Sequence, residues 1–396
     1  MGGSDMGPLD GLRILDLSRI LAGPTCTQLL GDLGAEVIKI ENPNGGDDTR
    51  SWGPPFVTDA DGAPTDLSSY FLCANRNKLS VAVDIATTAG QETIRAIAAQ
   101  SDVVIENFKP GGLAKYGLDA KTLLGDDPAL IYCSISGYGQ TGPNAHKPGY
   151  DLMAQGYGGI MSLTGAPDGE PMKTGVGIAD VMCGMYATVG ILAALRHRDQ
   201  TGEGQHIDLS LVDSQVAWLI NEGTGYLTTG KPPIRRGNGH PNIAPYQVFG
   251  TYDGHVIIAV GNDGQFRRFC DFLDLGDLPD DDRFATNAAR LNNRTALVAA
   301  LTPALGARTT DAIIAGLEGC GVPVGPVQTL DQVFASDQVA AREMQISMGA
   351  NDSSQPDVRL IGNPLKFSAT PVTYRHAPPR LGQDTAEVLR RLAVKR

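Results

Sequence analysis

The sequence predicts an α/β fold in which a doubly wound (Rossmann-like) large domain is accompanied by a smaller α+β domain. Two observations predict the sheet of the large domain. Strand and helix patterns alternate through the first third of the chain, and strands that are separated by helices pair in parallel. A third observation predicts the second domain, because 396 residues exceed the usual size of a single core. Ligands of such sheets bind beyond the carboxyl ends of the strands.

The expected elements follow one another closely in the first part of the chain. Short apolar runs predict strands over residues 12–17, 36–40, 80–83, 102–105 and 130–135. Helical patterns cover residues 25–33, which end before Gly34, and residues 88–100. The apolar run 181–195 is interpreted as a buried core helix, because it is too short to span a bilayer and is flanked by charges.

The pattern changes after residue 196. A strand is expected to end at residue 210 and a helix to continue to about residue 220, followed by a linker over 224–239 that is rich in Gly, Pro and Thr. A strand over 256–260 and short helices up to residue 318 indicate the smaller domain. An extended segment over 360–370 and a closing helix over 385–393 complete the chain. We therefore expect a large domain over 1–223, a small domain over 224–328 and a return to the large domain over 329–396.

Charge and composition exclude several classes of partner and site. Acidic residues outnumber basic ones 44 to 32, which argues against nucleic acid and anionic membranes as partners. The 6 cysteines contain no CxxC pair and the 6 histidines no HExxH motif, so we expect reduced thiols and no metal site. Residues 1–6 contain no targeting signal, so a cytoplasmic protein is expected.

Two common nucleotide-binding motifs are absent from the sequence. No GxGxxG follows the first expected strand, and no GxxxxGK[ST] occurs. The glycine clusters at 156–159 and 175–177 do not begin a βαβ unit. A nicotinamide-dependent enzyme is therefore disfavoured.

A single carboxylate, Asp180, lies where the glycine-rich segment 175–179 meets the apolar run 181–195. An acid at such a place is costly to bury, so it is usually paired, protonated or functional. One interpretation makes Asp180 the N-cap of the helix, where it accepts backbone N–H groups. The other makes it a catalytic group. The residues alone leave both open.

A set of motifs is spread over nearly the whole chain, at residues 8–17, 22–24, 31–41, 46–50, 75–78, 106–111, 136–142, 178–180 and 201–205. In their number, order and spacing these motifs resemble those of the family III coenzyme A transferases (CaiB/BaiF-type). This is the group of formyl-CoA transferase and succinate–hydroxymethylglutarate CoA-transferase.

The resemblance implies that Asp180 is a catalytic nucleophile and that an interlocked homodimer forms. Asp180 would attack an acyl-CoA thioester and pass through an acyl-aspartyl anhydride and an aspartyl-CoA thioester. Coenzyme A and a carboxylic acid would be substrates, with no permanently bound cofactor. The resemblance also implies a glycine-rich active-site loop with Gly237, Gly239 and His240. The CoA-contacting residues that it implies are Arg50, Asn77, Lys78, Asn107, Phe108, Lys115, Tyr138 and Gln140.

Two alternatives to CoA transfer stay open. One is a 2-methylacyl-CoA racemase, whose branch has a Gly-His-Asp sequence where this chain has Gly149-Tyr150-Asp151. Tyrosine, with an unperturbed pKa near 10, is a poor proton shuttle at neutral pH. The other alternative is a CoA-binding protein without catalysis.

The substrate acids are expected to be dicarboxylates. Segments 47–56, 136–143 and 240–247 are most similar to the succinate–hydroxymethylglutarate branch, and Leu21 replaces the Gln of formyl-CoA transferases. A second carboxylate requires an arginine. The candidates are Arg19, Arg50 and Arg235.

Overall fold

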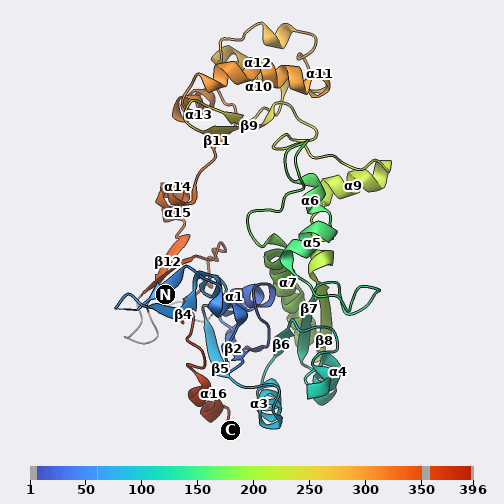
Figure 1. Ribbon diagram of the computed structural model, residues 1–396, viewed down its shortest axis with the longest axis vertical. Helices are drawn as coiled ribbons and strands as arrows, with labels where there is room; N and C mark the ends of the chain where they lie inside the picture. Colours follow the sequence, from blue (N-terminus) through green and yellow to red (C-terminus); the bar gives the residue numbers. More distant parts are fainter. Residues whose placement is uncertain (1–6, 60, 350–356, 394–396) are drawn as a thin grey trace. The chain divides into compact units, whose positions relative to one another are not determined.

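A six-stranded, entirely parallel sheet organises the larger part of the chain (Figure 1). The structure is a computed structural model that describes residues 7–59, 61–349 and 357–393. The strand order is β5-β2-β1-β6-β7-β8, so successive strands run outward from β1 on one side and from β6 on the other. The strands are β1 (Arg13–Asp16), β2 (Glu36–Glu41), β5 (Lys78–Ala82), β6 (Val103–Glu106), β7 (Ile131–Ser136) and β8 (Gln205–Ser210).

Alternate residues of these strands face two separate cores. On one face, Ile14 and Ile105 pack with helices α1 (Ala22–Asp32) and α7 (Ile178–Thr201). On the other face, Leu15 and Val104 pack with the helices α3 (Thr88–Ala98), α4 (Ala120–Asp126) and α16 (Thr385–Arg391). Side chains of a strand point alternately to opposite faces. Helices on both faces of a parallel sheet make this a doubly wound α/β fold, as expected from the sequence.

Helix α7 lies against α1 with little space between them. A Cβ atom on Gly184 would lie 2.5 Å from the backbone oxygen of Ala22, so only glycine permits this approach. By length and composition α7 could cross a membrane, but 56% of its most apolar window is buried inside the structure. Its contacts with α1 and the sheet make it a core helix and fix the position of its first turn.

The larger of two compact units comprises residues 1–160, 173–230 and 337–396. Besides the sheet it contains two hairpins and several short helices. Its C-terminal part is tied to the sheet, since Oδ2 of Asp384 accepts a hydrogen bond from the Ser80 backbone at 2.8 Å. The remaining elements are β3 (Phe56–Thr58), β4 (Pro64–Ser68), β12 (Gln345–Met348), β13 (Val358–Ile361), α2 (Ser69–Leu72), α5 (Asp151–Tyr157), α8 (Leu211–Ala217), α9 (Ile220–Thr229), α15 (Asp337–Ala341) and the 3-10 turns η1 (Asp48–Ser51) and η2 (Ala114–Tyr116).

The smaller unit comprises residues 161–172 and 231–336 and has its own core. A three-stranded antiparallel sheet in the order β11-β10-β9 packs with short helices. Its principal elements are β9 (Tyr246–Gly250), β10 (His255–Ala259), β11 (Val324–Pro326), α10 (Asp263–Phe272), α11 (Asn287–Asn292), α12 (Arg294–Gly306), α13 (Thr310–Gly319) and α14 (Leu330–Ala335). The expected domain boundaries at 223/224 and 328/329 stay predictions.

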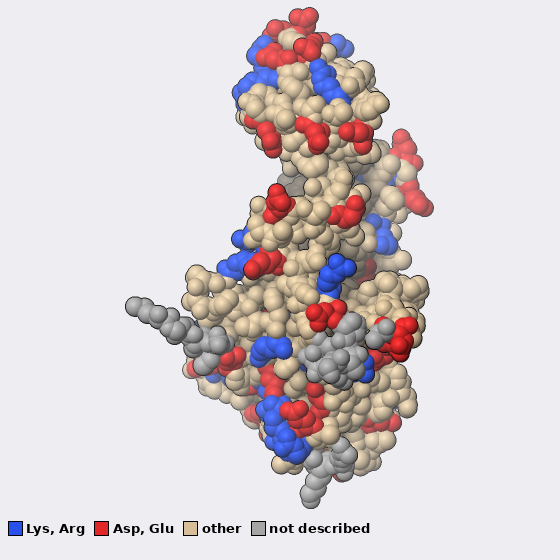
Figure 2. Space-filling model, turned by 90° about the vertical axis from the view of Figure 1, so that its left-hand side faces the viewer, with Lys and Arg blue, Asp and Glu red and all other residues tan. Residues whose placement is uncertain are grey.

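One expectation about local structure was wrong. The expected linker 224–239 begins with helix α9, which extends to Thr229, because the low helix propensity of Gly and Thr is only a weak prior. The expected extended segment 360–370 contains the end of strand β13, at Ile361, and no helix. The search for a targeting signal concerned residues 1–6, which lie outside the described residues. Figure 2 shows acidic and basic side chains interspersed over one face of the molecule.

Candidate functional site

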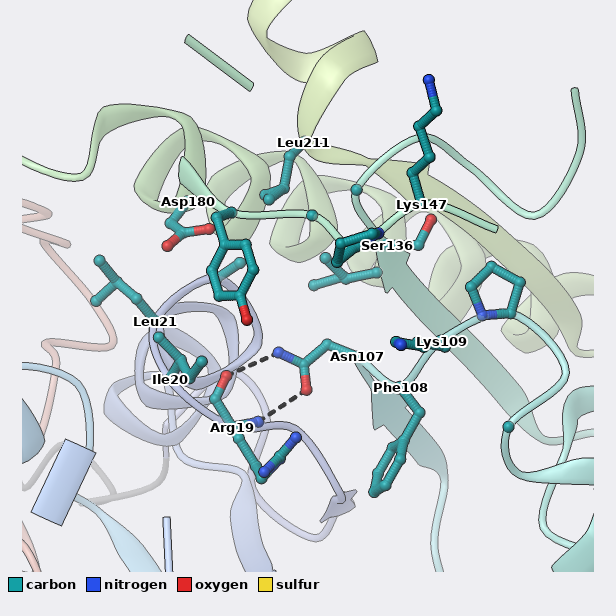
Figure 3. Close-up of a pocket in the computed structure, with 18 of the residues that line it drawn as sticks. Arg19, Ile20, Leu21, Asn107, Phe108, Lys109, Ser136, Lys147, Asp180 and Leu211 are labelled. Carbon is teal, nitrogen blue, oxygen red and sulfur yellow. Dashed lines mark hydrogen bonds between the residues drawn. The ribbon is translucent and has the colours of Figure 1, made fainter. Parts of the chain in front are cut away.

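A cavity of about 460 Å³ opens in the larger unit beyond the carboxyl ends of β1 and β6. These neighbouring strands are the point at which the strand order reverses, which is where doubly wound sheets bind ligands. The segment Arg19–Ala22 borders the cavity after β1, and the segment Asn107–Pro110 borders it after β6. Asp180, in the first turn of α7, completes the lining (Figure 3).

The segments that follow β1 and β6 are clamped together by Asn107. Its Oδ1 accepts a hydrogen bond from the Arg19 backbone at 2.9 Å, and its Nδ2 donates to the Arg19 carbonyl at 2.7 Å (Figure 3). The next residue, Ile20, has φ 71°, a conformation that costs a β-branched side chain about 1–3 kcal/mol. Its backbone N–H lies 3.2 Å from each Asp47 oxygen. The clamp therefore holds a strained lining loop in place.

A buried ion pair between Lys39 and Asp47 supports this loop. Lys39 and Asp47 are both inaccessible to solvent and lie 2.9 Å apart, and Lys39 Nζ also donates to the Ser18 carbonyl at 2.8 Å. Burial opposes the ionisation of Asp47, but the charge and hydrogen bond of Lys39 lower the pKa of Asp47 to about 2. Both partners are therefore charged at neutral pH. The ion pair between them holds the loop that follows β1 in a fixed position.

Asp180 is the most unusual group in the cavity. It is 9% exposed, and none of the described residues donates a hydrogen bond to its carboxylate. Burial, and secondarily the negative charge of Asp151, raise the pKa of Asp180 to about 7. A carboxylate without donors is a better nucleophile than one held by them, and its ionisation near neutral pH suits a reacting group.

The interpretation of Asp180 as the N-cap of its helix was wrong. The N-cap residue of α7 is Gly177. The side chain of Asp151, from α5, accepts hydrogen bonds from the first turn of α7 in place of a local capping side chain. Its Oδ1 accepts from the backbone N–H of Ala179 at 2.8 Å and of Asp180 at 3.4 Å. The backbone at the start of α7 is thus satisfied without the side chain of Asp180, which remains available to the cavity.

A short chain of hydrogen bonds orients Asp151. Gln155 donates from Nε2 to Asp151 Oδ2 at 2.7 Å, and its Oε1 accepts from the Thr174 backbone at 2.9 Å. Thr174 directly precedes the glycine-rich segment 175–179 that leads into α7. These hydrogen bonds therefore connect the start of α5, the segment that precedes α7 and the first turn of α7.

Basic side chains border the cavity on the sides away from Asp180 (Figure 3). All are exposed, and one of them, Arg19, also pairs with Asp48 at 2.8 Å. The cations in the lining are Arg19, Lys109, Lys115 and Lys147. Such a border suits a polyanionic ligand such as a phosphorylated nucleotide.

The structure brings only part of the predicted site together in the cavity: Asp180, Asn107, Phe108 and Lys115 line it. The remaining predicted CoA contacts lie outside this lining, several of them in structural roles. Arg50 is 4% exposed, and its guanidinium pairs with both carboxylate oxygens of Glu41 at 2.8 Å. Lys78 is inaccessible and lies 3.2 Å from Asp16; burial lowers its pKa to about 8.

Three further predicted contacts are also engaged elsewhere. Asn77 is buried and donates to Asp32 at 2.8 Å and to the Thr373 carbonyl at 2.7 Å. Tyr138 packs edge-on against Tyr157 with ring centroids 5.2 Å apart. Gln140 lines a second cavity, described below.

The predicted loop residues Gly237, Gly239 and His240 belong to the smaller unit. Gly237 has φ 59°, and the His240 ring stacks on Tyr246 with centroids 4.9 Å apart. Arg294 holds the loop through a 2.5 Å hydrogen bond to the His240 carbonyl. The loop is therefore ordered by contacts within its own unit.

Two contributors to the cavity were missed in the sequence. Asp151 was noted only as the neighbour of Tyr150, and nothing in its spacing shows that it caps a helix 28 residues further on. Lys147 lies in a loop without motif character. The packing of α5 against α7 brings Asp151 and the loop before α5 to the cavity. Among the described residues, no cluster of His, Cys, Asp and Glu is able to hold a metal ion.

Comparisons with known proteins agree on one family. Residues 9–385 match the family described as CoA-transferase family III. The chain is 48% identical to succinate–glutarate CoA-transferase of Agrobacterium fabrum over 97% of this chain and 96% of that protein. It is 43% identical to succinyl-CoA:glutarate CoA-transferase of Mus musculus over 97% of this chain and 86% of that protein. The crystal structure of a CaiB/BaiF family protein from Brucella suis superimposes with a TM-score of 0.89 at 48% identity, covering 98% of this chain and 100% of that one.

Proposed function

The chain belongs to CoA-transferase family III, and from this premise we propose that it moves coenzyme A from succinyl-CoA to a second dicarboxylate such as glutarate. One observation carries the proposal. Asp180, a buried carboxylate to which none of the described residues donates a hydrogen bond, lines a cavity at the reversal of strand order. The similarity to succinate–glutarate transferases supports the choice of acids.

The proposed reaction proceeds through two covalent states of Asp180. The carboxylate attacks the thioester carbonyl of the donor, so that an acyl-aspartyl anhydride forms and the thiolate of CoA leaves. The thiolate then attacks the aspartyl carbonyl, which forms an aspartyl-CoA thioester and releases the donor acid. The acceptor carboxylate repeats the two steps in reverse and regenerates Asp180.

The cavity supports each requirement of this sequence. Lys109, Lys115 and Lys147 offer positive charge to the phosphates of CoA. Burial of Asp180 limits the water that would hydrolyse an anhydride. The raised pKa of Asp180 keeps the group basic, at the cost of partial protonation at pH 7. CoA enters and leaves as a substrate, so no permanently bound cofactor is required.

Arg19 is the preferred partner for the distal carboxylate among the three candidate arginines. Arg19 is exposed and lines the cavity. Arg50 is buried against Glu41, and Arg235 in the smaller unit donates to backbone carbonyls of Ala166 and Gly169. Of the three, Arg19 alone therefore combines an accessible guanidinium with a position in the lining.

A transfer assay separates the proposal from its two alternatives. The protein is mixed with succinyl-CoA and glutarate, and glutaryl-CoA is measured by liquid chromatography. Formation by the wild type and loss of at least a thousandfold in Asp180→Ala support transfer. Exchange of the α-hydrogen of a 2-methylacyl-CoA for deuterium, without transfer, would indicate a racemase. CoA binding with neither reaction would indicate a binding protein.

The proposal includes a homodimer with interlocked chains in the cytoplasm. Apolar side chains on α7, α8 and α9 are left exposed, including Val189 at 63% and Leu227 at 83%, and such surfaces favour association. Cysteines without disulfides, such as the buried Cys26 and Cys133, suit a reducing compartment. Sedimentation equilibrium at micromolar concentration should give twice the mass of the chain, and cell fractionation tests the compartment.

A further inference from the structure

A second cavity, of about 280 Å³, lies on the α4 side of the sheet behind the loop that follows β6. It shares Lys109 and Gly112 with the main cavity. Glu106, the last residue of β6, contributes a carboxyl group to this second cavity and not to the lining of the main one. A carboxyl group thus lies directly behind the segment that borders the candidate CoA site.

Glu106 is bonded to the backbone of that segment. It is 6% exposed, and its Oε2 accepts a hydrogen bond from the Phe108 N–H at 2.7 Å. Phe108 and its neighbour Asn107 both line the main cavity, and Asn107 clamps Arg19. The geometry of this lining therefore depends on a buried acid that does not itself reach the cavity.

Ser134 and His206 accompany Glu106 in the lining of the second cavity. The Ser134 hydroxyl lies 3.0 Å from Nε2 of His206. The Ser134 side chain lowers the pKa of Glu106, against the larger effect of burial. The Phe108 N–H is therefore the group through which Glu106 acts on the loop after β6.

We propose that Glu106 is a titrating positioning residue, which in its ionised form fixes the segment Asn107–Lys109 and so strengthens the binding of coenzyme A. The inference rests on the proposed function for its ligand. An ionised carboxylate is a stronger acceptor for the Phe108 N–H than the protonated acid. Burial raises the pKa of Glu106 to about 7, so both forms are present at neutral pH.

The surroundings of Glu106 contain charges of both signs. The titratable groups around it come from four elements. They are Lys109 in the loop after β6, Tyr132 and Cys133 on β7, His206 on β8, and Asp119 and Lys121 at the start of α4. Burial lowers the pKa of His206, which favours its neutral form as the partner of Ser134.

The link between Glu106 and Phe108 is testable without any ligand. The chain contains 10 phenylalanines, so selective ¹⁵N-Phe labelling gives a simple amide spectrum, in which loss of a signal in Phe108→Leu assigns Phe108. The Phe108 amide is expected to shift with a midpoint near pH 7 in the wild type and not in Glu106→Gln. Asp119→Asn changes another carboxyl in the same cavity and should leave the titration intact. An amide that does not titrate, or titrates equally in Glu106→Gln, overturns the proposal.

The consequence for binding is measured with free CoA by calorimetry between pH 6 and 8. The background is Asp180→Asn, which removes the titration of Asp180, and the comparison adds Glu106→Gln. The proton equilibria of CoA are the same in both measurements and cancel. At pH 8 the single variant should bind three- to tenfold more tightly than the double variant, and at pH 6 equally. If the ratio of the two CoA affinities stays constant between pH 6 and 8, or reverses, the proposal is contradicted. A titrating Phe108 amide without CoA binding in either variant contradicts the assigned ligand and the proposed function instead.

Discussion

The carboxylate of Asp151 accepts a hydrogen bond from the backbone N–H of Asp180 at 3.4 Å, so one acid positions the other and also opposes its ionisation. The same Asp151 oxygen accepts from Ala179 at 2.8 Å. The first turn of α7 is thereby completed by a side chain from α5. This relationship couples the geometry of the proposed nucleophile to its pKa.

Replacement of Asp151 by asparagine should make the enzyme active at lower pH. The asparagine side chain retains an acceptor for the start of α7, but the change removes the negative charge that helps to raise the pKa of Asp180. The midpoint of the acid limb of kcat should move down by about one pH unit. The measurement is the pH dependence of glutaryl-CoA formation, with Asp119→Asn as the control. An acid limb that stays in place would show that burial alone sets the ionisation of Asp180.

Replacement of Asp180 by asparagine should stabilise the protein at high pH. The folded pKa of Asp180, about 7, lies above the unfolded value, so ionisation destabilises the fold. The penalty is absent below about pH 4, grows as the pH rises, and is complete above about pH 7. Asp180→Asn should therefore add on the order of 4 kcal/mol to the free energy of unfolding at pH 8.

Denaturant titration at pH 5 and pH 8 checks this expectation. Asp199, an exposed acid on the same helix, supplies the control Asp199→Asn. A gain in the free energy of unfolding that is equal at the two pH values would contradict the linkage, because it would not depend on the ionisation of Asp180.

Removal of the Asn107 side chain should weaken acyl-CoA binding more than it slows the chemical steps. Asn107→Ala loses both hydrogen bonds to the Arg19 backbone, each of which contributes about 1 kcal/mol. KM for succinyl-CoA should rise roughly tenfold. Steady-state kinetics measure it, with the exposed Asn44→Ala as the control. An unchanged KM would show that the loop after β1 keeps its conformation without the clamp.

Arg19→Gln should reduce the preference for dicarboxylic acyl groups. Succinyl-CoA presents a distal carboxylate to Arg19, whereas butyryl-CoA does not. Loss of a charge-assisted hydrogen bond of about 1.5–3 kcal/mol should lower the ratio of kcat/KM for succinyl-CoA over butyryl-CoA ten- to a hundredfold. The matched variant is Lys121→Gln, which removes a cation from the second cavity. Equal loss with both substrates would assign Arg19 to the CoA phosphates.

The sequence predicted the parallel sheet because strands such as β1, β6 and β7 are buried, nearly continuous apolar runs between helices. The expected strand over 102–105 is observed as Val103–Glu106, and the expected helix over 385–393 as Thr385–Arg391. Helix α9 was missed because Gly223 and Gly225 lower the helix propensity of its sequence. Asp180 was found because a lone acid before an apolar helix is conspicuous.

The remainder of the site is not visible in the sequence for physical reasons. The sequence does not distinguish a buried arginine such as Arg50 from an exposed one, because its partner Glu41 is recognised only in the structure. The capping by Asp151 is a tertiary contact between α5 and α7. The support of Phe108 by Glu106 spans only two residues, but its burial depends on β7 and β8. In each case the decisive fact is which elements of the fold lie next to one another.

Covalent labelling of Asp180 tests the central proposal most directly. The wild type and Asp180→Ala are mixed with succinyl-CoA, treated with hydroxylamine, and examined by intact-protein and peptide mass spectrometry. The proposal predicts an acyl or CoA adduct on the wild type that hydroxylamine converts to a hydroxamate at Asp180, and none on the variant. An adduct that persists in Asp180→Ala, or its absence from a wild type that transfers CoA, would contradict Asp180 as the nucleophile.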